Sequence, residues 1–333
     1  MKNKYLISIT IPTYNRLDSI KNIFSFLIKD KLFNKFEICI SDNNSEDQTY
    51  NYLCKLKEKY ANIVINKNES NIGYEGNLRK AIDISNGEYV WTLSDDDILS
   101  EYAIRNVYQT VKENNGISLF FLNYNIVNED TNTIINSRCE INENGIYNKN
   151  DFIEKVRLAN SFGGSNIFKR KDLLNINLDD YANNLYCHVF WCFELLEKSR
   201  IYIISSIIIN MRGLSFESSR LEKKNDPLSS FDYYLNAHFQ LCKSLLVIKN
   251  SDYNKSCYNK IYNQLIYESL WQVTVFKIRN LNCSLKVKYY IFKNLKFYFR
   301  SSYFFWLLIF PLIFSNNKFI KLLYLLQRKI RKK

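Results

Sequence analysis

The sequence predicts an α/β fold, in which a mostly parallel central sheet carries helices on both faces and a helical region follows it. Three observations support this prediction. Apolar, β-branched runs alternate with amphipathic stretches through the first hundred residues, with short loops between them. Residues 88–93 form an apolar run typical of a buried strand, and Asp95, Asp96 and Asp97 follow it. From about residue 229 the pattern changes to long helical stretches.

The composition suits a packed protein with two parts. Of the 333 residues, 47% are hydrophobic and only 8 are Gly and 3 are Pro, which argues against disorder and a turn-rich all-β protein. We expect a sheet domain over residues 1–225 and a basic helical region over 226–333. Residues 5–11 lack a small-residue cleavage site and are interpreted as a first strand, not a signal peptide.

Cysteine and histidine usage excludes two classes of site. The eight cysteines form no CxxC pair, which is typical of reduced core cysteines in a cytosolic protein and not of a disulfide framework or a zinc site. The chain has only two histidines, so a histidine-rich metal site is excluded.

The expected elements follow one another in chain order. The strands of the first hundred residues are expected at 7–11, 36–40, 62–66 and 88–93. A first helix is expected to begin at about residue 17. A second should begin at a capping box formed by Ser45 and Gln48 and run to about residue 60, and a third should end at a C-cap formed by Asn86 and Gly87. Later elements are helices at 101–113, 151–159, 189–198, 231–248 and 258–278, strands at 117–124 and 201–209, and a hairpin or loop over 126–147.

Three polar loops are expected to meet at one edge of the sheet, where open α/β sheets bind their ligands. These loops are residues 13–16, 41–45 and 94–97, and each carries Asp or Asn. Three adjacent aspartates repel one another, so a cation is expected to compensate them, and Mg²⁺ or Mn²⁺ fits because carboxylate oxygens are its preferred protein ligands. The alternative is a solvated acidic loop before a helix with Ser100 as its N-cap.

The formal charge of +13 is concentrated at the C-terminal end of the chain. Residues 285–333 contain twelve Lys and Arg and no Asp or Glu, so the rest of the chain is near neutral. Residues 303–314 are uncharged and apolar but shorter than the ~20 residues that a membrane span needs. We expect a helix in the membrane interface that anchors a cytoplasmic, peripheral protein at the inner face of the cell membrane. The alternative is a core helix with a basic end.

Several short motifs together resemble a known family. They are the stretches Ile9 to Arg16, Glu37 to Ser45, Asn71 to Gly73 with Asn77, Gly87 to Val90, and Ser94 to Asp97, and residues 161–170 extend them more weakly. In this order and spacing they resemble the family 2 glycosyltransferases of the GT-A fold, and the Ser-Asp-Asp-Asp form looks most like transferases of bacterial surface polysaccharides, including the abequosyltransferase-like subgroup. The resemblance covers about the first hundred residues closely.

The resemblance implies a nucleotide-sugar donor, a divalent ion and a set of site residues. Donor contacts would come from the first loop, the second-strand aspartate and neighbouring side chains, namely Thr13, Tyr14, Arg16, Asp42, Asn43, Asn77, Arg79 and Asp95. Asp97 would bind the metal with Asp95, which would also contact the ribose, and Asp96 could take the role of either and is a catalytic candidate. Gly163 and Gly164 indicate close backbone approach to a ligand or a tight bend, and the resemblance places the acceptor near them.

The sequence departs from the family where a Glu-Asp pair is usual. Tyr186 to Trp191 occupies that region, so His188 is the best-placed base, with an unperturbed pKa of about 6.5. A histidine that bonds backbone at a helix start is the alternative. Asp179 and Asp180 are candidate acceptor contacts, and Trp191 is either an acceptor-stacking platform or a core residue.

The leading functional hypothesis is a metal-assisted glycosyltransferase, a hexosyl- or related sugar transferase. It would move a sugar to a hydroxyl of a lipid-linked or surface glycan precursor of the O-antigen, capsule or cell-wall type. The alternative is a nucleotide-sugar-binding or scaffolding relative without a working base. No nucleic-acid partner is expected, because the apolar block at 303–314 fits such a partner poorly and the aspartates would be unexplained.

Overall fold

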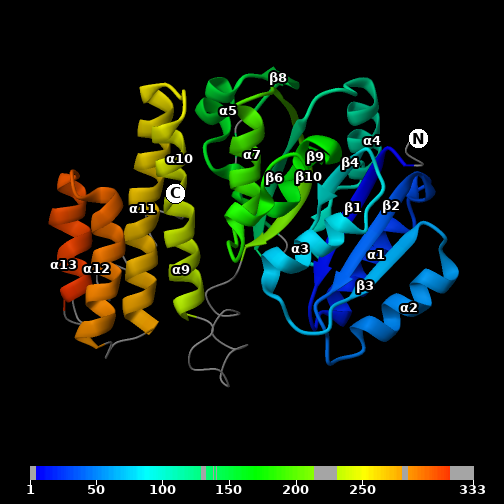
Figure 1. The fold of residues 1–333 in the computed structure, drawn as a ribbon, viewed down its shortest axis with the longest axis horizontal. Coiled ribbons are helices and arrows are strands. Elements are labelled where there is room, and N and C mark those ends of the chain that lie inside the picture. Colours follow the sequence, from blue (N-terminus) through cyan, green and yellow to red (C-terminus); the bar gives the residue numbers. More distant parts are fainter. Residues whose placement is uncertain are drawn as a thin grey trace. The chain divides into compact units, whose positions relative to one another are not determined.

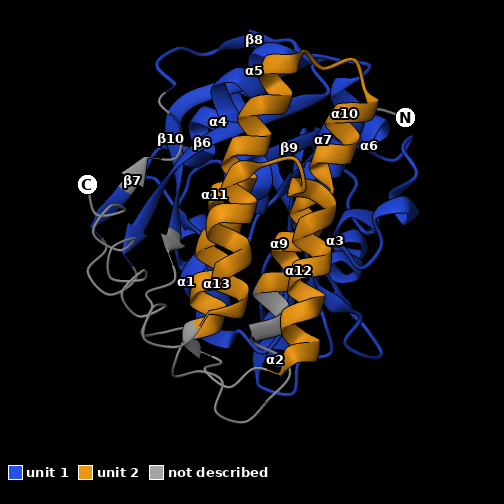
Figure 2. Cartoon of the chain, turned by 90° about the vertical axis from the view of Figure 1, so that its left-hand side faces the viewer, with its two compact units in different colours: residues 1–219 blue, residues 220–333 orange. Residues whose placement is uncertain are grey.

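The computed structural model describes residues 5–128, 133–137, 139, 141–213, 231–279 and 284–315. The chain divides into two compact units, Met1–Ser219 and Arg220–Lys333, which Figure 2 shows in different colours. Each unit has its own packed interior.

The described part of the first unit contains a ten-stranded sheet (Figure 1). Its order is β3-β2-β1-β4-β9-β6-β10-β5, with β7 paired to β6 and β8 paired to β10. The strands β1 to β4 are parallel to one another, whereas β9 runs antiparallel between β4 and β6. The strands are β1 (Ile7–Thr13), β2 (Phe36–Asp42), β3 (Ile63–Lys67), β4 (Tyr89–Thr92), β5 (Ile98–Leu99), β6 (Leu119–Asn128), β7 (Ile134–Ser137), β8 (Gly145–Tyr147), β9 (Asn166–Lys169) and β10 (Ile201–Gly213).

Helices lie on both sides of this sheet, as the sequence predicts. The α-helices of the first unit are α1 (Leu17–Leu27), α2 (Thr49–Lys59), α3 (Gly73–Asp83), α4 (Ala103–Glu113), α5 (Lys149–Val156), α6 (Arg170–Leu173) and α7 (Cys187–Leu196). Short 3₁₀ turns are η1 (Phe33–Lys35), η2 (Ala159–Ser161), η3 (Gly163–Ser165) and η4 (Leu178–Tyr181). The predicted fold class is therefore confirmed. The sheet is mixed, and its first four strands in the chain are the parallel ones.

The core of the first unit lies around its central strands. Every residue of β1, β2 and β4 is buried, including the polar residues Ser8, Thr10 and Glu37, so these strands lie in the interior of the unit. Helix α1 buries Ile20, Ile23, Phe24 and Leu27, the residues that its predicted spacing places on one face.

Several predicted helix ends are wrong. Helix α2 begins at Thr49 after Gln48, without a side-chain cap, because the Ser45 hydroxyl instead accepts a hydrogen bond from Asn15 N at 2.9 Å. Helix α3 ends at Asp83, and Gly87 is needed where the chain passes close to the backbone of Ser8.

Other boundaries move by a few residues. Helix α4 starts after Tyr102, so Ser100 is not its N-cap, and α5 starts at Lys149 because Asn148 caps it. The weak 126–147 stretch contributes the end of β6 and the strands β7 and β8. Seven of the eight cysteines are described and all seven are free thiols, and Cys283 lies outside the described residues.

The second unit is helical. Its elements are α9 (Phe231–Cys242), α10 (Ser244–Asn250), α11 (Lys255–Arg279), α12 (Leu285–Phe299), a π-helical turn (Phe305–Ile309) and α13 (Phe310–Phe314). The single helix predicted over 231–248 is broken at Lys243. Helices α11, α12 and α13 lie side by side (Figures 1 and 2), joined by ring contacts such as Tyr262–Phe299 and Phe292–Phe310, each with centroids 5.3 Å apart.

The apolar block at 303–314 is partly core and partly surface. Phe305, Ile309, Leu312 and Ile313 are buried, whereas Tyr303 and Leu307 are among the exposed large side chains. No helix in the described ranges combines the length and the apolar character that a membrane crossing requires. The basic residues of 316–333 lie outside the described part of the chain.

Candidate active site

The candidate site lies where β1, β2 and β4 end together. Thr13 is the last residue of β1 and pairs in register with Asp42, the last residue of β2. The Thr13 hydroxyl donates a hydrogen bond of 2.7 Å to Asp95 Oδ2, which lies just beyond β4. The expectation that the three loops meet at one edge of the sheet is met by these contacts.

Asp42 is fully buried, and only one of its two carboxylate oxygens has a hydrogen-bond partner. Its Oδ2 accepts a hydrogen bond of 2.9 Å from Ser45 N, but its Oδ1 has no hydrogen-bond partner. A buried acceptor without a donor is costly unless a ligand supplies one. The residue therefore offers a binding point for an N–H group, such as one on the edge of a nucleobase.

The aspartates at the end of β4 are not a solvated loop, so that alternative is wrong. Asp95 and Asp97 are buried, and β5 follows them and pairs with β10. Burial, followed by repulsion from Asp96, raises the pKa of the Asp95 carboxyl to about 6. Burial and Asp96 also raise the pKa of Asp97 well above its ordinary value. Both carboxylates would therefore be stabilised by a cation.

Asp96 is more exposed and already has partners. Its Oδ2 lies 3.3 Å from Arg16 Nη1, and its Oδ1 accepts a hydrogen bond of 2.7 Å from the Ser94 hydroxyl. Arg16 is about half exposed, and Tyr14 is also exposed. Both first-loop side chains are thus accessible to a donor at this edge.

A pocket of about 210 Å³ adjoins the aspartates. All three aspartates line it, together with residues of α1 and β5. Pockets for small molecules are usually ≈300–1,000 Å³. It is therefore too small to hold an entire nucleotide sugar, and the rest of a donor would lie outside it.

The adjacent glycines are held against the aspartates. Gly163 O accepts a hydrogen bond of 2.7 Å from the Thr92 hydroxyl, and Gly164 O accepts one of 2.8 Å from Trp91 Nε1. A Cβ on Gly164 would overlap Asp97 Oδ2. The predicted close backbone approach is therefore present, although it is made to a carboxylate of the site.

Asn43 and Asn77 belong to a group of four amide side chains, Asn43, Asn68, Asn71 and Asn77, which we call the asparagine network. Asn68 Nδ2 bonds both Asn43 Oδ1 (3.1 Å) and Asn77 Oδ1 (2.9 Å), and Asn43 Nδ2 bonds Asn71 Oδ1 (2.8 Å). Asn77 Nδ2 also donates to Thr13 O at 3.2 Å. The network thus fixes the first loop, and Asn68 joins it although no sequence motif pointed to this residue.

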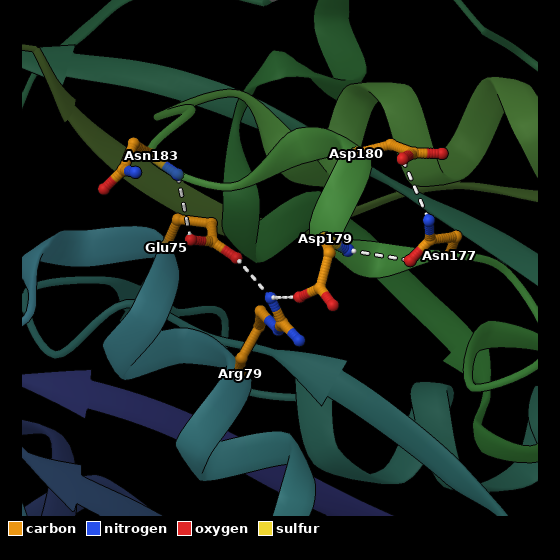
Figure 3. A network of polar contacts seen from close by, with 6 residues as sticks. All are labelled: Glu75, Arg79, Asn177, Asp179, Asp180 and Asn183. Atoms are coloured by element: carbon orange, nitrogen blue, oxygen red, sulfur yellow. Dashed lines mark hydrogen bonds and ion pairs between the residues drawn. The ribbon is translucent and has the colours of Figure 1, made fainter.

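Arg79 and Asp179, predicted for donor and acceptor, contact each other (Figure 3). Arg79 Nη1 on α3 lies 2.7 Å from Asp179 Oδ1 of η4 and 3.5 Å from Glu75 Oε1. Glu75 Oε2 accepts a hydrogen bond of 3.1 Å from Asn183 N, whose residue has a φ of 57°. Asp180 instead accepts a hydrogen bond from Asn177. The buried Glu75 was missed, and its only sequence signal is the i,i+4 spacing from Arg79.

His188 lies on α7, close to Gly163. The ring is buried, its Nε2 lies 2.9 Å from Ser161 O, and its Nδ1 has no hydrogen-bond partner. Burial lowers the pKa of His188 to about 4, so the imidazole is neutral at pH 7. Its Cε1 would lie 4.0 Å from a Cβ on Gly163. The role of His188 as a base stays a prediction.

Trp191 does not offer a platform for an acceptor. Its side chain is fully buried, with its ring 6.2 Å from that of Phe168 in an edge-to-face contact. The stacking prediction is wrong, because α7 is buried along most of its length and this ring belongs to the core.

The sheet and the carboxylates at its edge define a GT-A glycosyltransferase domain. The profile of the family described as "Glycosyl transferase family 2" matches residues 8–176, about half of the chain, so the protein belongs to this family. The predicted resemblance and the enzyme class are confirmed.

Similar proteins include bacterial glycosyltransferases. An abequosyltransferase of Salmonella typhimurium is 35% identical over 101 residues, which span only 30% of either chain. The GalNAc(5)-diNAcBac-PP-undecaprenol beta-1,3-glucosyltransferase of Campylobacter jejuni is 28% identical over 75% of this chain and 79% of its own. TarS residues 1–349 from S. aureus, solved with UDP-GlcNAc, share the fold with a TM-score of 0.62, at 16% identity over 89% of this chain and 81% of that one.

Proposed function

We propose that this family 2 glycosyltransferase moves a sugar from a nucleotide-sugar donor to a hydroxyl of a lipid-linked or surface glycan precursor, with Mg²⁺ or Mn²⁺ bound. The observation that carries the proposal is the meeting of Thr13, Asp42 and Asp95 at the ends of three adjacent strands. One of the named relatives carries undecaprenol in the name of its acceptor, which supports a lipid-linked acceptor here.

The chain's own residues fit a metal that arrives with the donor. The described residues contain no group of three or more His, Cys, Asp or Glu side chains able to hold a metal alone. Mg²⁺ is commonly bound by one or two carboxylates together with substrate phosphates. Asp97 and Asp95 are proposed as those carboxylates, since burial and repulsion from Asp96 raise the pKa of both. The bound ion would stabilise charge on the departing diphosphate.

The remaining donor contacts are assigned to residues of the three loops. Asp42 Oδ1, which lacks a hydrogen bond, would accept one from the nucleobase. Arg16 and Tyr14 of the first loop are exposed, and Arg16 would exchange part of its contact with Asp96 for a phosphate oxygen. Asn43 and Asn77 are proposed to shape the first loop through the asparagine network.

His188 is proposed as the base for the acceptor hydroxyl. Its low pKa keeps the imidazole neutral, and its Nδ1 has no competing hydrogen bond. A His188→Asn variant should keep donor binding and lose roughly 10²–10⁴-fold in transfer rate. His238→Asn is the matched control, because His238 is also buried but belongs to the second unit. Equal rates for His188→Asn and wild type would move the base to Asp96, Asp179 or Asp180.

A second candidate is a nucleotide-sugar-binding relative without transfer activity. The burial of His188 favours it, because an acceptor must reach a ring that the chain now covers. Donor binding without turnover, under conditions that supply a lipid-linked acceptor, would select this candidate.

We also propose peripheral attachment at the inner face of the cell membrane. The twelve cations of residues 285–333, without an anion, would attract this region to anionic headgroups. An acceptor carried on a membrane lipid would then be within reach.

The test is a thermal-shift panel of UDP-, GDP-, CDP- and dTDP-sugars with and without Mn²⁺. Binding at about 100-fold over Kd stabilises the native state by roughly 2.7 kcal/mol. One nucleotide class should raise the melting temperature only with metal, and Asp97→Asn should abolish that rise. Asp18→Asn is the control, because Asp18 is 94% exposed on α1. A metal-dependent rise that survives Asp97→Asn would remove Asp97 from the metal site.

A further inference from the structure

A groove of about 400 Å³ lies between α10 and α12 in the second unit. Four cations line it, namely Lys249 of α10, Lys293 and Lys296 of α12, and Arg300, the C-cap of α12. All four are exposed, and none of them forms an ion pair with another described residue. The groove therefore holds an uncompensated positive charge.

Three of the four cations come from α12 and its C-cap. Residues 293 and 296 of α12 and its helical C-cap, residue 300, are spaced to lie on the same face, whereas Ile291, Leu295 and Phe299 are buried on another. Residues 285–315 contain no Asp or Glu. Like charges at these spacings destabilise a helix, so an anion bound between them would relieve a cost that the folded chain now bears.

Aromatic side chains hold one of the cations in place. Lys296 Nζ lies 5.3 Å from the ring centroid of Phe292 and 5.9 Å from that of Trp306. Phe292 is itself fixed by rings of the following segment, such as Phe310 at 5.3 Å. Cation–π contacts of this kind position the ammonium group before any ligand arrives.

The same groove exposes apolar surface. Tyr289 and Phe297 line it and are 62% and 64% exposed, and Leu246 adds an aliphatic side chain from α10. A small free anion would use the cations and leave these side chains in water. A phosphate joined to a hydrocarbon chain would use both, because its charge matches the cations and its chain covers the apolar groups.

We propose that this groove binds the phosphate headgroup of an anionic membrane lipid, with the start of its hydrocarbon chain against Tyr289, Phe297 and Leu246. Residues 316–333 are a poor occupant, because they carry seven Lys and Arg and no acidic residue. The inference rests on the proposed membrane attachment and gives it a defined binding site within the described helices.

The test is co-sedimentation of the full chain with phosphatidylcholine vesicles that contain or lack phosphatidylglycerol. A groove variant carries Lys293→Gln, Lys296→Gln and Arg300→Gln. A control variant of the same unit and charge change carries Lys243→Gln, Lys255→Gln and Lys286→Gln, which are exposed and outside the groove. Each lipid-facing cation contributes about fivefold, so the groove variant should bind anionic vesicles roughly a hundredfold more weakly. The control should lose less than about fivefold.

Three outcomes would overturn the proposal. Equal losses of vesicle binding in the two variants would mean that anionic vesicles attract the overall positive charge of the protein and not the groove in particular. Release from vesicles by millimolar inorganic phosphate, at constant ionic strength, would identify a site for the free ion. Binding to a single-stranded RNA that depends on the groove cations, without vesicle binding, would identify a nucleic-acid surface.

Two further measurements keep the result interpretable. The groove variant should retain the melting temperature of the wild type, since its substitutions are at exposed positions. The nucleotide-sugar thermal shift should also be unchanged in it. If vesicle binding depends on the groove while no donor produces a shift, the groove assignment stands and the proposed donor site fails.

Discussion

Gly164 approaches the Asp97 carboxylate so closely that a methyl group on its α-carbon would overlap Oδ2. The glycine is fixed there by its carbonyl, which accepts a hydrogen bond from Trp91 on β4. Strand β4 therefore leads into the aspartates and also holds the backbone of Gly164, which limits the orientation of the Asp97 side chain.

Gly164→Ala should lower metal-dependent donor turnover by about a hundredfold, because displacing a site carboxylate by about 1 Å has effects of this size. Gly145→Ala is the control, since its Cβ would meet the Tyr147 ring at an ordinary 3.4 Å. Steady-state kinetics and the melting temperature of both variants check the prediction. Full activity in Gly164→Ala would show that Asp97 functions from another position.

Thr13→Val should shift the pH dependence of turnover upward. The Thr13 hydrogen bond lowers the pKa of Asp95, which burial has raised to about 6, so its removal raises that pKa further. Ionised Asp95 then requires a higher pH, and kcat/KM should fall more steeply from pH 8.5 to pH 6.5 than in the wild type. Thr13→Ser keeps the hydroxyl and should retain the wild-type profile. Identical profiles for the valine and serine variants would contradict the role of this bond.

Neither histidine should titrate between pH 8 and pH 5.5. Burial lowers the pKa of both His188 and His238 to about 4. Because these values are below the unfolded value, the folded state binds fewer protons, and its stability is lost as pH falls from about 6.5 to 4. The loss should be on the order of 3 kcal/mol for each histidine. The two imidazole C2–H signals in NMR provide the measurement, and a midpoint near 6.5 for His188 would show that its ring reaches solvent.

Arg79→Gln should destabilise the first unit by about 1–3 kcal/mol, because it leaves the buried Glu75 carboxylate without its cation. Asp179→Asn is the comparison, and since Asp179 is 76% exposed it should cost less than about 1 kcal/mol. Adding Glu75→Gln to Arg79→Gln should recover part of the loss. Urea unfolding of the three variants checks this, and equal costs for Arg79→Gln and Asp179→Asn would show that Asp179 is the partner that matters.

The parallel strands and their polar ends could be predicted from sequence because their signals are local. Strands β1, β2 and β4 are buried along their whole length and are rich in β-branched and aromatic residues, which is a local strand signal. The first-loop residues and the aspartates follow directly from where those strands end. No local signal shows that β9 lies antiparallel between β4 and β6, or that Gly164 meets Asp97.

The errors have a common physical cause. Ser45 suits a helix cap by type, but tertiary structure gives its hydroxyl to Asn15 N instead. Trp191 suits either a core or a stacking role by type, and the packing of α7 places it in the core. In both cases the side chain is compatible with two partners, and the choice between them depends on neighbours far away in the chain.

The asparagine network contains no ionisable group, whereas the carboxylates beside it carry the charge of the site. Amides do not respond to acidity and are little affected by ionic strength. A shift in proton or salt concentration should therefore change how strongly the site attracts a charged ligand while leaving the loop that receives the ligand in place. The shape of the loop and the affinity of the site for charged ligands therefore depend on separate sets of side chains. Evolution or engineering can alter one of them without changing the other.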